Sequence, residues 1–173
     1  MRAFLGFLGL NPAAPDAGDT IRRIAAELDR LEPAQARYVA AFAFVLSRVA
    51  GADHDISADE TASMERLVRE KAGLAADQAT LVVEIARTQQ RLFGGTDDFL
   101  VTRELAAVAS DEQKLALVDC LFAVAAADAS VRVEETNEIS RIAKELRVDP
   151  AEVTRIRSRY RDHLASRRGL GNV

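Results

Sequence analysis

Two acidic stretches, ADHDISADET at 52–61 and ADASVRVEET at 127–136, repeat one pattern 75 positions apart. Each begins with Ala-Asp, continues through a β-branched residue and a second acid, and ends in Glu-Thr. Carboxylate oxygens are the ligands that Ca²⁺ and Mg²⁺ prefer in proteins. The candidate metal ligands are Asp53, Glu60, Asp128 and Glu135, with Asp55, Asp59 and Glu134 as accessory ligands.

The same residues are also compatible with a purely structural turn. The first Asp of each stretch follows an apolar helix. The C-terminal end of a helix carries partial negative charge, which disfavours an acid, so this Asp needs a compensating partner. Backbone N–H groups or an arginine could supply that partner while Ile56 or Val131 plugs the core. An EF-hand is excluded, because Ala58 stands where Gly is required and Met64 where a bidentate Glu is required. The structural turn and the hard-cation site both stay open.

The elements that carry these turns are predicted to be helices throughout. Apolar residues recur at steps of three and four, and no run alternates with a period of two. We expect about eight helices, near residues 19–31, 34–52, 58–72, 76–93, 97–109, 111–127, 133–146 and 150–166. Ser57 with Glu60, and Ser110 with Gln113, predict capping boxes at two helix starts. The fold class is therefore all-α.

The repeat extends beyond the turns, through residues 46–70 and 121–145. Two segments, 38–50 and 115–127, are apolar nearly all round, and helices of that kind belong in the interior. We expect them to form a central pair with the other helices wrapped around it. The halves, about 34–93 and 111–166, are then two helical hairpins related by an approximate twofold.

This repeated pattern, Ala-Asp-x-x-(Ile/Val)-x-x-acidic-Glu after an apolar helix, resembles the TerB-like family, named for tellurite resistance protein B. The resemblance covers about residues 20–165 and is strongest over 96–153. It departs at His54 and Ala129, where members usually have Gly. The resemblance implies an all-α, pseudo-twofold fold and an association with tellurite and stress resistance. It also implies acidic surface residues that bind divalent metal, which in this chain are the four candidate ligands above.

Length and composition indicate one soluble domain, at residues 19–166, between an apolar arm and linker at 1–18 and a tail at 167–173. A net charge of −4 gives no global attraction to nucleic acid or anionic lipid. The opening MRAFLGFLGL has a short apolar run and no clean cleavage site after it, and the single cysteine fits a reducing compartment. We expect a cytoplasmic protein, with contact between residues 1–10 and the inner face of a membrane as an alternative.

Other candidate sites are weaker. Cys120, inside an apolar segment, is expected to be a buried structural thiol. Its neighbour Asp119 is expected to pair with a basic residue at a groove, because an unpaired buried carboxylate is costly. The histidines, His54 and His163, belong to no recognisable catalytic set, and the arginines of 155–168 spread around their helix.

The sequence therefore favours a non-enzymatic stress-response module whose acidic turns bind a divalent cation, Ca²⁺ or Mg²⁺, or a basic partner. The alternative is a helical interaction scaffold with purely structural turns, in peripheral contact with a membrane through its arm. We expect an unidentified protein partner, with self-association into a homodimer as an alternative. Nucleic acid is not an expected partner.

Overall fold

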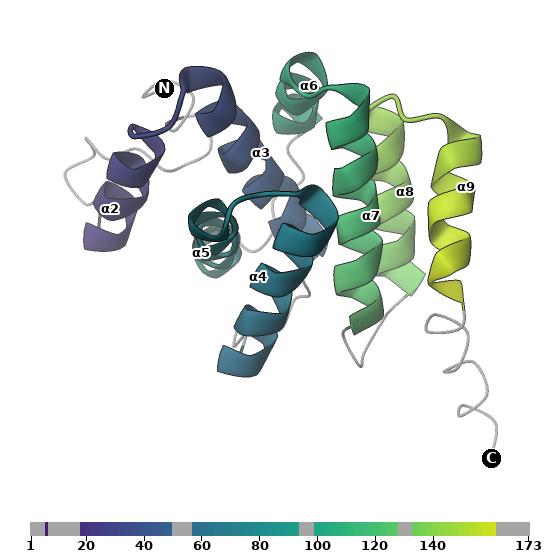
Figure 1. Cartoon of the computed structure of the whole chain (residues 1–173), viewed down its shortest axis with the longest axis horizontal. Helices are drawn as coiled ribbons and strands as arrows, with labels where there is room; N and C mark the ends of the chain where they lie inside the picture. The colour runs from purple at the N-terminus through teal and green to yellow at the C-terminus, as the bar shows by residue number, and fades with distance from the viewer. Residues whose placement is uncertain (1–5, 7–17, 50–56, 94–98, 128–132, 162–173) are drawn as a thin grey trace.

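The computed structural model describes Gly6 and residues 18–49, 57–93, 99–127 and 133–161 (Figure 1). These residues contain no strand, and their helices are α2 (Asp19–Leu28), α3 (Pro33–Val49), α4 (Ala58–Ala72), α5 (Ala76–Phe93), α6 (Phe99–Val108), α7 (Asp111–Ala127), α8 (Val133–Glu145) and α9 (Pro150–Arg159). The all-α prediction is confirmed. The boundaries agree with the expected ranges to within three residues, except that α9 ends at Arg159 instead of near residue 166. α2 ends earlier than expected, because the Arg30 and Leu31 N–H groups bond the carbonyls three residues back, of Glu27 and Leu28, and so tighten the chain into a turn.

Local signals in the sequence set several helix starts. In α4 the Glu60 N–H donates to Ser57 Oγ at 3.2 Å, and the Ser57 N–H donates to Glu60 Oε2 at 2.7 Å. Ser110 and Gln113 form the same reciprocal pair before α7, at 3.2 and 2.9 Å. Both predicted capping boxes are confirmed. Each satisfies N–H groups that would have no partner in the first helical turn.

Two helices end on residues with left-handed backbone. Gly73 has φ +65° after α4, a conformation that glycine adopts without steric cost. Arg147 has φ +60° after α8. There the Val148 N–H bonds the Ala143 carbonyl and the Arg147 N–H bonds the Lys144 carbonyl, as in a Schellman motif. Arg147 therefore carries backbone strain at a position that usually holds glycine.

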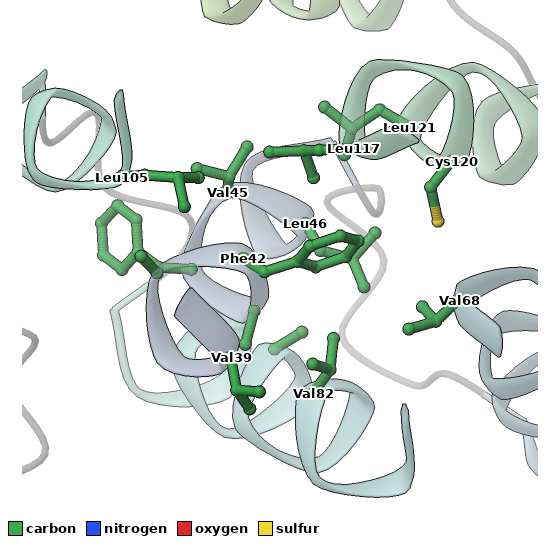
Figure 2. Packing of buried hydrophobic residues seen from close by; sticks show 14 of the residues in the cluster. Val39, Phe42, Val45, Leu46, Val68, Val82, Leu105, Leu117, Cys120 and Leu121 are labelled. Atoms are coloured by element: carbon green, nitrogen blue, oxygen red, sulfur yellow. The ribbon is translucent and has the colours of Figure 1, made fainter. Parts of the chain in front are cut away.

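The core is built around α3, in which almost every residue from Ala36 to Val49 is buried. Figure 2 shows Phe42 and Leu46 between α7 above and α5 below, with Leu117 and Leu121 projecting from α7. A helix without a polar face has to be covered on all sides. α5, α6, α7 and α8 provide that cover.

The expected central pair, α3 and α7, forms only in part. α3 and α7 do touch, but α3 packs mainly on α5 and α6, and α7 mainly on α4, α8 and α9. In Figure 1, α4, α7, α8 and α9 lie in a row beside the α3–α5–α6 group. The physical reason is that both helices are apolar all round, so several neighbours compete for each face.

The hairpin halves also differ from the expectation. α7 and α8 pack side by side, whereas α4 packs on α5 and α7 and makes no extensive contact with α3 within the described residues. Equivalent core positions of the repeat are nevertheless buried in both copies: Met64 and Leu67 in α4, Ile139 and Ile142 in α8. The twofold relation between the halves stays a prediction.

Candidate functional site

The first acidic turn is described only from Ser57 onward; Asp53, His54 and Asp55 lie outside the described residues. Asp59 and Glu60 are exposed in the first turn of α4. An acid is favoured there, because the N-terminal end of a helix carries partial positive charge. Glu60 already accepts one hydrogen bond at Oε2 in the capping box, so part of its acceptor capacity serves the helix start.

The second turn is described from Val133 onward, so Asp128 lies outside, and the side chain of Glu134 is not described. Glu135 is the third residue of α8, as Glu60 is of α4. Their surroundings differ: Glu60 is exposed and Glu135 is half-buried. In Figure 1 the first turns of α4 and α8 both lie at the lower end of the view, where α7 also ends.

The described residues do not make a metal centre by themselves. Within 18–49, 57–93, 99–127 and 133–161, no group of three or more His, Cys, Asp or Glu side chains is placed to hold a metal ion. A hard cation in a protein site takes six to eight oxygen ligands. A site at either turn therefore depends on residues of 50–56 or 128–132.

The side chain of Arg48, at the end of α3, is a nearly buried charge, 2% exposed. Its Nε donates to Glu138 Oε1 at 2.8 Å, and its Nη1 donates to Glu145 Oε2 at 3.0 Å and to Thr102 Oγ1 at 2.8 Å. Arg141 pairs with the second oxygen of each carboxylate, at 3.0 Å from Glu138 Oε2 and 3.9 Å from Glu145 Oε1. This network joins α3, α6 and α8, and we call it the Arg48 joint.

A second polar joint surrounds Asp119, the one acid in the apolar part of α7. Its Oδ1 accepts from the Tyr160 hydroxyl at 2.7 Å and lies 3.3 Å from Arg159; its Oδ2 lies 3.9 Å from Lys71. The expected pairing with a basic residue is confirmed. Burial, and then the hydrogen bond to Asp119, raise the pKa of Tyr160. The Asp119 joint ties α9 and α4 to α7.

The next residue, Cys120, is fully buried, as expected. Burial raises the pKa of its thiol to about 12, with a smaller contribution from Asp119. Burial likewise raises the pKa of Tyr38, whose hydroxyl has no hydrogen-bond partner within the described structure. A thiol held protonated in this way is a poor nucleophile, because thiolate is the reactive form.

Sequence reasoning missed the Arg48 joint. One signal was available: Ser47 and Arg48 are the only polar residues in an apolar stretch that otherwise runs from 38 to 50. The carboxylates that receive the guanidinium lie 90 and 97 positions further along the chain, and no local pattern identifies them. Tyr160 was missed for the same reason.

Comparison with known proteins agrees with this architecture. Within the described residues no helix is both long enough and apolar enough to cross a membrane. No curated protein and no solved structure matches the chain. A family model described as tellurite resistance protein TerB matches residues 38–158, which span the helices from α3 into α9 and both acidic turns. The chain belongs to the TerB family of tellurite resistance proteins.

Proposed function

We propose that this protein is a non-enzymatic binding module of tellurite and stress resistance, whose two acidic turns bind a divalent cation or a basic partner. The observation that carries the proposal is the TerB match across both turns. The exposed carboxylates of Asp59 and Glu60 at the start of α4 add to it. Negative charge gathered on an accessible helix start attracts cations and basic segments.

The non-enzymatic part of the proposal rests on the groups that could do chemistry. Cys120, the one cysteine, is buried with its pKa raised to about 12. Asp119 is held by Tyr160 and Arg159, so it is engaged as a structural acceptor. Arg48 is likewise engaged by carboxylates in the interior.

A second candidate function is a helical interaction scaffold with structural turns, in peripheral membrane contact through residues 1–10. One observation favours it: Glu60 stabilises the start of α4 through its capping box, which gives this acid a structural role without any ligand. Loss of such a cap costs about 1 kcal/mol of stability.

Calorimetric titration separates the two candidates. Ca²⁺, Mg²⁺ and Mn²⁺ are titrated into the wild type and into an Asp53→Asn/Asp128→Asn variant, in which each turn loses one charge but little volume. The matched control is Asp77→Asn/Asp111→Asn, because these acids also lie in first turns of helices but outside the repeated pattern. The proposal expects binding heat in the wild type and the control and none in the turn variant.

The same variants decide the outcome. Absence of heat with every metal in the wild type removes the cation version and leaves a basic partner or purely structural turns. Equal loss in the turn variant and in the control would show a general charge effect rather than a site. Growth on tellurite of cells that carry the wild type or the turn variant tests the resistance role. Equal tolerance with and without the protein would contradict it.

A further inference from the structure

The exposed large apolar side chains of the described structure gather on one helix, α6. Phe99 is 52% exposed, Leu100 49% and Val108 37%. The opposite side of α6, with Val101, Thr102 and Leu105, is buried against α3 and α8. In Figure 1, α6 lies at the upper edge of the molecule. A ten-residue helix thus presents apolar side chains to solvent on its exposed face.

The exposed face of α6 consists of two rows, and within each row the residues are four positions apart along the helix. The first row is Phe99, Arg103 and Ala107, and the second is Leu100, Glu104 and Val108. Each row therefore has an apolar residue at either end and a charge in the middle. The middle charges have opposite signs. The Arg103 guanidinium lies over the Phe99 ring, 5.6 Å from its centroid, within the first row.

We propose that this face of α6 is an interface between two copies of the chain, related by a twofold axis that runs roughly along the helix. Such an axis places the first row of one copy against the second row of the other. Arg103 of each copy then meets Glu104 of the other, twice in the dimer. Above and below this charged layer, apolar residues meet apolar residues.

The charge pattern selects this orientation over its opposite. A twofold axis perpendicular to the helix would place each row against itself, so that two Arg103 side chains and two Glu104 side chains would meet. Like charges that face each other across an interface are costly. Rows of residues spaced four apart on one helix also pack well against such rows on a second helix when the two helices cross at about −50°.

The size of the face sets the strength of the dimer. Two ten-residue helices cover much less than the roughly 1,200 Å² of total area that stable complexes bury. The dimer is therefore weak and reversible, and it forms at high local concentration.

The test is sedimentation velocity on the full chain over concentrations from about 10 µM to about 1 mM, the range that a small interface requires. The wild type is compared with Arg103→Glu and with Glu104→Arg, both on exposed positions. Each substitution turns two attractive contacts into two repulsive ones and is expected to weaken self-association by about tenfold. The control is Arg69→Glu, the same charge change on an exposed position of α4.

Mixing the two variants is the decisive arm. The Arg103→Glu chain presents two acids and the Glu104→Arg chain two bases, so a mixed dimer has both contacts attractive, and association is expected to recover or exceed that of the wild type. A monomeric wild type at every concentration would overturn the proposal, as would variants that associate like the wild type or a mixture that stays monomeric. Loss of association in Leu5→Asp/Leu8→Asp, with wild-type behaviour of both α6 variants, would assign the contact to the N-terminal arm instead.

Discussion

Replacing Arg48 by Met tests whether the Arg48 joint holds the two groups of helices together. The Arg48 side chain is 2% exposed and pairs with the side chains of Glu138 (19% exposed) and Glu145 (13% exposed). Met keeps most of the aliphatic volume and removes the charge. The two carboxylates then lie close together in a poorly solvated place, where the described structure places Arg141 beside both of them.

The expected loss of stability in Arg48→Met follows from that geometry. Removing one partner of a buried ion pair costs about 3–5 kcal/mol, because an uncompensated charge stays behind. Arg141 and partial solvent access favour the low end, so we expect a loss of about 3 kcal/mol in the free energy of unfolding. For a chain of this length that corresponds to a decrease in Tm of about 6–12 °C.

Urea unfolding followed by circular dichroism measures the effect. The control is Arg66→Met, because Arg66 pairs with Glu70 at 3.6 Å with both side chains more than half exposed, and such pairs contribute less than about 0.5 kcal/mol. Adding Glu138→Gln and Glu145→Gln to Arg48→Met should recover most of the loss. A decrease of less than about 1 kcal/mol, or one equal to that of the control, would refute the reasoning, since ion pairs of that strength are typical of exposed surfaces.

Three further predictions concern single groups. Tyr160→Phe should lower the free energy of unfolding in urea by about 1–2 kcal/mol, because it removes the donor to Asp119. Tyr38→Phe deletes a hydroxyl that has no hydrogen-bond partner among the described residues, so it should be neutral or stabilising. Equal effects of the two substitutions would contradict this. Folding raises the pKa of Cys120 from 9.0 to about 12, so as the pH rises the thiol of the unfolded chain ionises first, and the free energy of unfolding should decrease between these pH values. Cys120→Ala should make that decrease smaller. Identical pH dependence of stability in the wild type and the variant would contradict this prediction. Arg147→Gly should raise Tm by relieving the left-handed strain at φ +60°, and a lower Tm would contradict it.

Much of the fold could be predicted from the sequence because helix formation is largely local. The three- and four-residue spacing of apolar residues located the helices, and the capping pairs at Ser57 and Ser110 located two of their starts. The family resemblance could be recognised for a similar reason, since it depends on a short repeated motif. The ligand-binding role of the turns stays a prediction, because Asp53 and Asp128 lie outside the described residues.

The sequence by itself determined which residues are helical, that most described residues of the apolar segments 38–50 and 115–127 would be buried, and that Asp119 needed a basic partner. Only the tertiary structure decided which helices pack together and which cations and carboxylates meet. A helix that is apolar all round accepts neighbours on any face, so its own sequence does not select them. Packing brought Arg48 to Glu138 and Glu145, and Tyr160 to Asp119, across 41 to 97 positions of chain.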